Sequence, residues 1–356
     1  MSYRDLRQFF EARRDDPGGL VLASVYDTLG STYSKTGDRM LIASDGDFQG
    51  MLSGGCLEGD LAERAQRVLD RSQPESVTYD LRRNDEELWG LGVGCEGLMR
   101  IFLQPLHRDH GFEPFPAMIG VLEGDEPGVL VTVIDGPQAS APPGACVVGT
   151  AQRLTSIGVS GGSQDALHAA ARDTLDADRS QYLTLKSGDQ SVELLCAMLR
   201  PPPRVLILGG GLDAQPLLRA LFDLGWRVTV QDHRPAYIDK GDFSLAERVL
   251  CEPAASLLQV LDLDRYAGVV VMSHHLDTDR SYLQQLAKTK VAYIGLLGPP
   301  DRRRRLVDEL GPDAGQLEGR LHGPAGLPLG GRGPASIALS IAAELHRELM
   351  AGRGPA

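Results

Sequence analysis

The sequence predicts an α/β protein in which an N-terminal mixed α/β domain precedes a C-terminal Rossmann-like domain with a doubly wound parallel sheet. From residue 204 on, an apolar run, three glycines, an amphipathic stretch and a second apolar run follow one another in "RVLILGGGLDAQPLLRALFDLGWRVTVQDHRP". Two more apolar runs come later, "AGVVVMSHH" and "VAYIGLLG", with helical spacing between them. Short apolar strands that alternate with helices are typical of βαβ units, whose strands are parallel.

The first 200 residues have a different pattern. Strand-like runs such as "GLVLASVYDT" and "DRMLIASDG" surround one stretch of helical spacing, "LAERAQRVLDRS". The region 107–200 adds further strand-like runs and one helix, separated by turns rich in proline and glycine. The run "PPP" at 201–203 is a rigid, extended segment. We therefore predict two domains, residues 1–200 and 204–350.

Composition narrows the class of function. The chain has 356 residues, of which 42% are hydrophobic and 24% charged, as in globular proteins with a sizeable core. Its net charge of −12 argues against broad binding of nucleic acid or of anionic membranes. No apolar run approaches the roughly 18–20 residues that span a bilayer, and the N-terminus lacks the apolar stretch of a signal peptide. We expect a cytoplasmic protein without nucleic-acid or membrane partners.

Cysteine usage points to thiols rather than to crosslinks. The five cysteines are an odd number, they are widely spaced, and no C-x-x-C pair occurs among them. Zinc sites and disulfide frameworks need paired cysteines at short or regular spacing. We therefore predict no structural metal site and no disulfide framework.

A glycine-rich turn follows the first apolar strand of the C-terminal domain. Gly209, Gly211 and Ala214 match the G-x-G-x-x-G/A fingerprint, and Asp232 ends the second strand. In this motif the glycines permit a tight turn and the close approach of a pyrophosphate, while the acid binds a ribose hydroxyl. The turn predicts a Rossmann fold with a nucleotide-type site. No second motif supports hydride transfer, so NAD(P) or another nucleotide stays an open choice.

Two further candidates belong to the same edge of the predicted sheet. His274 follows the third apolar strand, and ligands of open α/β sheets bind at the carboxyl ends of strands. Arg302 begins a run of four arginines near the start of a helix, where cations are unfavourable unless an anion is near. The alternatives are a polar loop that caps the next helix and solvated arginines paired with neighbouring carboxylates.

Two cysteines lie in glycine-rich segments, each followed closely by a glutamate. The first segment, "SGGCLEGDL", contains Gly54, Gly55, Cys56 and Glu58, and the second, "LGVGCEG", contains Cys95. Glycines permit positive φ and the approach of a bulky ligand, and a helix N-terminus lowers the pKa of a nearby thiol. The alternative is that the cysteines are small packing residues and that the glutamate only caps a helix.

Several segments together resemble one family. "GSTYSKTGDRMLI", "SGGCLEGDL" and "LGVGCEGLMRIFLQPL" are similar to the N-terminal motifs of the XdhC/CoxI family, the xanthine dehydrogenase accessory factors. "RVLILGGG", "YIGLLGPPDRRRRL" and "GPAGLPLGGRGPASIALSIAAELHREL" resemble its C-terminal Rossmann domain, whereas residues 107–200 contribute little. The chain departs from the pattern at Ser34, where a basic residue is expected, and at Pro299, where a serine is common.

The resemblance implies a chaperone that binds molybdenum cofactor of the molybdopterin type, supports its sulfuration with a cysteine desulfurase and delivers it to a xanthine dehydrogenase-type molybdoenzyme. It implies a homodimer and a maturation factor without turnover of its own. Cys56 and Cys95 would line the cofactor, and Gly209, Gly211 and Asp232 would hold its nucleotide or phosphate end. The alternatives are an NAD(P)-dependent oxidoreductase and a nucleotide-binding regulatory protein.

Overall fold

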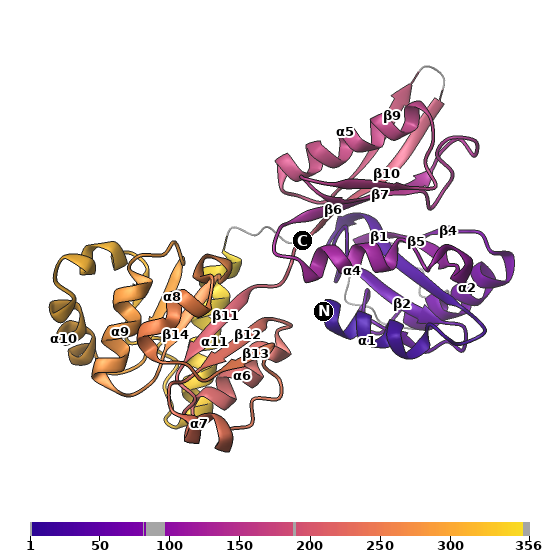
Figure 1. The fold of residues 1–356 in the computed structure, drawn as a ribbon. Coiled ribbons are helices and arrows are strands. Elements are labelled where there is room, and N and C mark those ends of the chain that lie inside the picture. The colour runs from indigo at the N-terminus through magenta and orange to yellow at the C-terminus, as the bar shows by residue number, and fades with distance from the viewer. Residues whose placement is uncertain (1, 81, 83–96, 188–189, 352–356) are drawn as a thin grey trace. The chain divides into compact units, whose positions relative to one another are not determined.

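The chain divides into two compact units at the junction of Pro201 and Pro202, each with its own core (Figure 1). The computed structural model describes residues 2–80, 82, 97–187 and 190–351. Each unit is described by itself.

The first half of the N-terminal unit is an antiparallel sheet in the order β3-β2-β1-β5-β4. Helix α2 covers one face of this sheet, where Leu61, Ala65 and Val68 pack against residues of β1 and β2. Apolar residues every three to four positions place these side chains on one stripe of the helix. The elements are α1 (Tyr3–Arg13), β1 (Leu20–Gly30), β2 (Arg39–Ala43), β3 (Phe48–Gln49), α2 (Glu58–Arg71), β4 (Glu75–Asp80) and β5 (Gly97–Leu106).

The second half of this unit is another antiparallel sheet, in the order β8-β7-β6-β10-β9. Helix α5 covers one of its faces, and α1 and α4 pack in a core that also contains residues of both sheets. The strand-like runs and the helix predicted between 107 and 200 are thus present. The elements are η1 (Arg108–His110), α4 (Phe115–Glu123), β6 (Gly128–Asp135), β7 (Cys146–Thr150), β8 (Leu154–Ile157), α5 (Gly162–Ala177), β9 (Gln181–Ser187) and β10 (Gln190–Leu199).

The C-terminal unit confirms the predicted Rossmann-like fold. Its strands are all parallel in the order β13-β12-β11-β14-β15-β16, so the direction of winding reverses between β11 and β14 (Figure 1). Separate apolar cores cover the two faces of the sheet, one built with α9 and α10 and the other with α6 and α11. The strands and helices that surround the switch point are β11 (Arg204–Leu208), α6 (Ala214–Asp223), β12 (Arg227–Gln231), β14 (Gly268–Val271), α9 (Leu276–Leu286), β15 (Tyr293–Leu296) and α10 (Pro300–Leu310). The remaining elements are α7 (Pro235–Lys240), β13 (Arg248–Leu250), η2 (Ala254–Ser256), α8 (Leu257–Val260), η3 (Leu263–Arg265), η4 (Gly311–Leu317), β16 (Leu321–His322) and α11 (Pro334–Met350).

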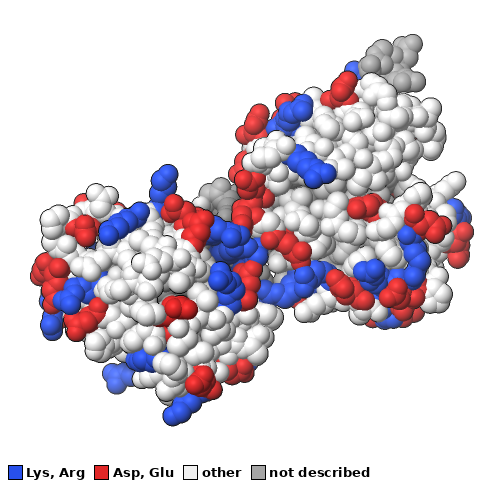
Figure 2. Space-filling model, in the orientation of Figure 1, with Lys and Arg blue, Asp and Glu red and all other residues white. Residues whose placement is uncertain are grey.

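The surface mixes charges of both signs. Figure 2 shows acidic and basic side chains interspersed over the displayed face of each unit. Within the part of the chain that the structure describes, no helix combines the length and apolar character that crossing a bilayer requires.

Candidate functional site

The glycine turn of the C-terminal unit connects β11 to α6 at the switch point of the sheet. Gly209 has φ +130°, and a Cβ at this position would lie 2.4 Å from the carbonyl oxygen of Met272. Only glycine fits where the end of β11 passes so close to the chain that leaves β14. Helix α6 begins at Ala214, which is completely buried, as the third position of the fingerprint requires.

Asp232 organises this turn from the end of β12. Its carboxylate is completely buried and accepts hydrogen bonds from the Gly210 N–H at 2.7 Å and from the Arg234 N–H, Nε and Nη2 at 2.9, 2.9 and 2.7 Å. Burial alone would raise the pKa of Asp232, but the hydrogen bonds from Arg234 and Gly210 outweigh it and lower the pKa. Arg234 also stacks on the ring of Tyr237 at 3.7 Å. Both carboxylate oxygens are engaged within the protein, and the predicted ribose contact stays a prediction.

His274 lies directly across the switch point from the turn. Its Nε2 is 2.8 Å from Oδ2 of Asp213, the residue that precedes α6, and this contact raises the pKa of His274. The backbone of His274 has φ +62°, in the left-handed region that residues with side chains seldom adopt. Helix α9 starts just beyond it with His275 at its N-cap, without a side-chain cap hydrogen bond.

Arg302 joins a buried chain of polar groups at the same edge of the sheet. Its Nη2 donates to Oδ2 of Asp279 at 2.6 Å, and Oδ1 of Asp279 accepts from the Ser273 hydroxyl at 2.5 Å. Asp279 is completely buried, so Arg302 supplies the charge that balances it. The nearby Arg304 and Arg305 pair with carboxylates on their own helix. This agrees with the alternative prediction that the arginines are solvated and paired with neighbouring carboxylates.

Two polar residues of this edge, Asp213 and Asp279, have no signal in the sequence, whereas Ser273 follows the third apolar strand beside His274. Asp213, Ser273 and Asp279 connect the turn, the end of β14 and α10. Asp213 and His274 are 61 residues apart, and only the pairing of β11 with β14 brings them together. No local pattern reports a contact of this kind.

The loop before α2 carries the first cysteine segment and is held by Glu58. This residue is 3% exposed, and its Oε1 accepts from the backbone N–H groups of Leu52 and Ser53 at 2.9 and 2.8 Å. Its Oε2 accepts from the Ser53 hydroxyl at 2.5 Å and from the Leu57 N–H at 3.2 Å. Burial opposes ionisation, but these hydrogen bonds outweigh it and lower the pKa of Glu58. Glu58 is therefore the residue that fixes the shape of the loop.

Cys56 is presented by this loop just before the helix. Gly54 and Gly55 have φ +78° and +105°, and a Cβ on Gly55 would meet nothing within 4 Å. Cys56 itself is half-buried against the core beneath α2, and it is a free thiol. The glycines thus leave open space beside the cysteine. Cys95 lies outside the described residues.

The described parts of all three N-terminal motifs meet at one end of the first sheet. A Cβ on Gly97 would lie 2.5 Å from the carbonyl oxygen of Ser31, and one on Gly54 would lie 3.6 Å from the ring of Tyr33. Ser34, which stands where the family pattern favours a basic residue, is 2% exposed and donates to the Met51 carbonyl at 3.4 Å.

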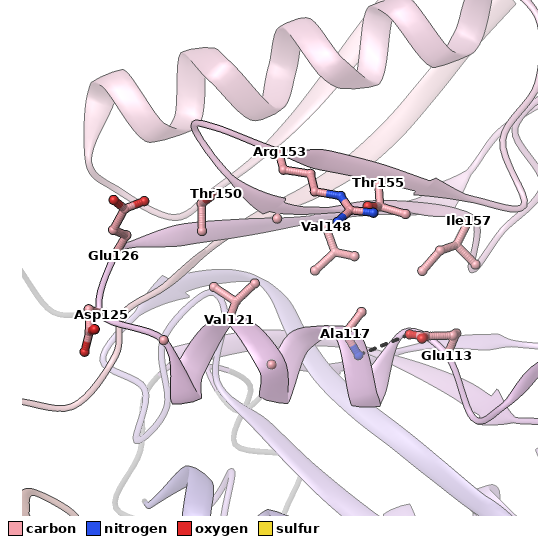
Figure 3. Close-up of a pocket in the computed structure, with 13 residues that line it drawn as sticks. Glu113, Ala117, Val121, Asp125, Glu126, Val148, Thr150, Arg153, Thr155 and Ile157 are labelled. Carbon is pink, nitrogen blue, oxygen red and sulfur yellow. Dashed lines mark hydrogen bonds between the residues drawn. The ribbon is translucent and has the colours of Figure 1, made fainter.

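A separate cavity of about 690 Å³ lies between α4 and the β7–β8 hairpin (Figure 3). Val121 and Val148 form part of its apolar lining, and Glu113 and Arg153 contribute charged groups. The Glu113 carboxylate accepts from the Ala117 N–H at 3.2 Å at the start of α4. Of the predicted site residues that the structure describes, none lines this cavity.

Comparison with known proteins identifies both units. Residues 205–345 match the XdhC Rossmann domain model, and residues 14–80 match the XdhC and CoxI family model. A protein of Bacillus subtilis (strain 168), named as a probable xanthine dehydrogenase subunit, is 28% identical over 94% of each chain. The "Molybdenum cofactor insertion chaperone PaoD" of Escherichia coli (strain K12) is 22% identical over 93% of this chain and 85% of its own length.

A solved structure extends the similarity to the whole fold. A protein of Bacillus halodurans, described as a xanthine dehydrogenase, superposes with a TM-score of 0.77 at 27% sequence identity. The match covers 99% of this chain and 97% of that protein. Together with the matches to both family models, it shows that this chain belongs to the XdhC and CoxI family.

Proposed function

We propose that this protein is an accessory factor that binds molybdenum cofactor, supports its sulfuration and delivers it to a xanthine dehydrogenase-type molybdoenzyme. The observation that carries the proposal is the extent of similarity to PaoD, which spans 93% of this chain and is not confined to the Rossmann unit. A Rossmann domain alone is compatible with many ligands. Similarity over both units favours the maturation role that the relative's name describes.

Two parts of the chain would take part in holding the cofactor. In the N-terminal unit, the loop fixed by Glu58 presents Cys56 beside the open space at Gly55, which suits a bulky ligand. In the C-terminal unit, Gly209 N–H and Gly210 N–H bond Gln231 and Asp232, and it is Gly211 and the start of α6 that would face a phosphate or nucleotide end. Cys95 joins this proposal through the family resemblance.

The partners follow from the same resemblance. We extend the proposal to a cysteine desulfurase as the source of sulfur, a homodimer as the working form and the cytoplasm as the compartment. A half-buried thiol in a held loop is a suitable place for contact with a sulfur-bearing cofactor.

The deciding experiment is a cofactor-binding and transfer assay. The purified protein is mixed with molybdenum cofactor under anoxic conditions, separated from free cofactor and then exposed to air. We expect near-stoichiometric retention, slower oxidation of the cofactor and activation of a cofactor-free xanthine dehydrogenase-type enzyme. Failure to retain the cofactor, with tight binding of NAD(P)H and a substrate-dependent absorbance change, would instead establish an NAD(P)-dependent oxidoreductase.

A thiol variant tests the N-terminal site separately. Cys56→Ser should lower cofactor retention about tenfold, whereas Cys251→Ser, at an exposed thiol of the other unit, should retain it like the wild type. Both variants should melt within about 2 °C of the wild type, because neither thiol fills a deep core position. If Cys56→Ser and Cys95→Ser both retain the cofactor normally, the two thiols are packing residues.

A further inference from the structure

The space beside Gly211, the second glycine of the G-x-G-x-x-A fingerprint, is filled by side chains of the protein itself. A Cβ on Gly211 would lie 2.9 Å from Oδ1 of Asp213 and 3.8 Å from Cδ2 of His274. In Rossmann folds this glycine lacks a side chain so that a pyrophosphate can approach the backbone. A carboxylate oxygen therefore stands beside the backbone that a pyrophosphate approaches in this fold.

Asp213 is held in this position by its hydrogen bond with His274 rather than by the helix that it precedes. The residue is 8% exposed, and its Oδ2 is 2.8 Å from Nε2 of His274. It stands at the N-cap of α6 but makes no side-chain cap hydrogen bond. The positive end of α6 favours an anion nearby, and the carboxylate supplies one.

His274 reaches Asp213 from a strained backbone. It is the one described non-glycine residue of the C-terminal unit with a positive φ, a backbone conformation that residues with a side chain disfavour. Ser273, the residue before His274, anchors the loop. Its hydroxyl donates to Asp279, and its backbone carbonyl accepts a hydrogen bond from Arg234 Nη2 at 3.2 Å. The imidazole is thus fixed over the turn although 58% of its side-chain surface is exposed.

We propose that Asp213 and His274 form a latch that occupies the phosphate position of the glycine turn and decides which ligands enter it. A phosphate-bearing ligand enters by displacing the Asp213 carboxylate, and His274 then becomes the cation that faces the phosphate. A ligand without a phosphate gains no such partner and leaves the latch closed. This inference rests on the proposed function only in taking the turn as the site for a phosphate or nucleotide end.

The latch has a consequence for pH dependence. Three charged groups affect the pKa of His274, namely Asp213 of the turn, Asp279 of α9 and Arg302 of α10. The hydrogen bond that the imidazole donates to Asp213 has the largest effect and raises this pKa. Phosphate needs the protonated imidazole, so its affinity should fall as the pH rises through the pKa of His274 in the complex. The Asp213→Asn variant has no carboxylate to raise the pKa of His274 in the free protein. Its side chain should also no longer compete with the phosphate for His274, at any pH.

The test is a calorimetric titration of the full chain with inorganic pyrophosphate, NAD and, as a ligand without phosphate, adenosine. We expect Asp213→Asn to bind pyrophosphate and NAD about tenfold more tightly than the wild type, and His274→Gln to bind them about tenfold more weakly. Asp223→Asn is the matched control, since it removes the same charge at the other end of α6. Adenosine binding should not change in any variant. Thermal melting checks that each variant is folded.

Each outcome separates the latch from the proposed function. If Asp213→Asn binds pyrophosphate no more tightly than the wild type, the latch is wrong, whatever the cofactor-transfer assay shows. If neither the wild type nor Asp213→Asn binds pyrophosphate or NAD, the turn is not a phosphate site and the latch is also wrong. If Asp213→Asn gains affinity for pyrophosphate and NAD but the protein does not retain molybdenum cofactor, the latch stands and the proposed function fails.

Discussion

The loop that leads into α2 and the turn that leads into α6 use the same components in different ways. Each contains consecutive glycines, and each is fixed by a buried carboxylate that accepts hydrogen bonds from backbone N–H groups. This carboxylate belongs to Glu58 in the N-terminal unit and to Asp232 in the C-terminal unit. Glu58 bonds residues no more than six positions away. Asp232 reaches Gly210 across 22 positions and is balanced by Arg234. The first arrangement is local, and the second depends on the sheet.

The difference lies in what each held loop leaves beside its glycines. Open space surrounds the missing side chain of Gly55, whereas Asp213 and His274 fill the space at Gly211. The pattern of glycines and an acid thus encodes a fixed loop in both units. Access for a ligand is decided by other side chains, and the N-terminal loop is accessible while the C-terminal turn is closed.

The largest loss of stability should come from adding one methyl group at Gly209, in the turn between β11 and α6. Gly209→Ala combines φ +130° with a contact of 2.4 Å to the Met272 carbonyl, so it should destabilise the C-terminal unit by at least about 4 kcal/mol. Urea denaturation followed by Trp226 fluorescence measures this, because that tryptophan is buried in the same unit. Gly210→Ala is the control, since the nearest atoms to its Cβ, in Asp232, Ile238 and Phe243, would lie at 3.4–3.5 Å. Equal losses in both variants would contradict the argument from close approach.

The local loop should lose less when its carboxylate is removed. Glu58→Ala leaves the buried N–H groups of Leu52 and Ser53 and the Ser53 hydroxyl without their acceptor, which should cost about 3 kcal/mol of unfolding free energy. The Leu57 N–H keeps its bond to the Ser53 oxygen at 2.7 Å. Because the pKa of Glu58 is lowered in the folded protein, its carboxylate contributes its full stabilisation above the ordinary pKa of a glutamate. This stabilisation is lost as the pH falls through the pKa that Glu58 has in the folded protein. Urea denaturation at pH 7 and near pH 3 should therefore show a gap between wild type and variant that narrows in acid. A gap independent of pH would mean that the carboxylate charge is not what holds the loop.

The sequence predicts the elements around both loops better than the contacts within them. Apolar runs and the glycine fingerprint predict β11, α6 and β12, because periodicity and turn chemistry are local properties. The same applies to the helix after Cys56, which begins at Glu58.

Contacts set by strand order are a different matter. Asp213 meets His274 only because β14 pairs with β11. Arg302 was expected near an anion or near acids of its own helix, and its partner is Asp279 of α9. Neither pairing has a signature in the spacing of residues, since both depend on how the sheet is assembled.

A smaller effect should separate the arginines of α10. Arg302→Ala removes the cation that faces the buried Asp279, and a loss of about 2 kcal/mol is expected because the Ser273 hydroxyl still bonds that carboxylate. Arg305→Ala breaks an exposed pair with Glu309 and should cost less than about 0.5 kcal/mol. Urea denaturation of the two variants gives the comparison directly. Indistinguishable stabilities would show that the pair of Arg302 with the buried Asp279 contributes no more than an exposed ion pair.

The smallest effect concerns the rate at which a reagent modifies the thiol of Cys56. In a Cys95→Ser background, the exposed Cys251 should react with iodoacetamide first and the half-buried Cys56 more slowly. Burial raises the pKa of Cys146 to about 12 and that of Cys196 to about 11, so these two thiols should stay unmodified in the folded protein. Glu58→Gln should speed the modification of Cys56 severalfold, because its amide group replaces one of the oxygens that fix the loop, while Cys251 serves as an internal standard. Mass spectrometry of the digested protein follows each site. A Cys56 rate that ignores Glu58 would mean that the loop presents its thiol without the carboxylate, and the parallel between the two loops would then end at their glycines.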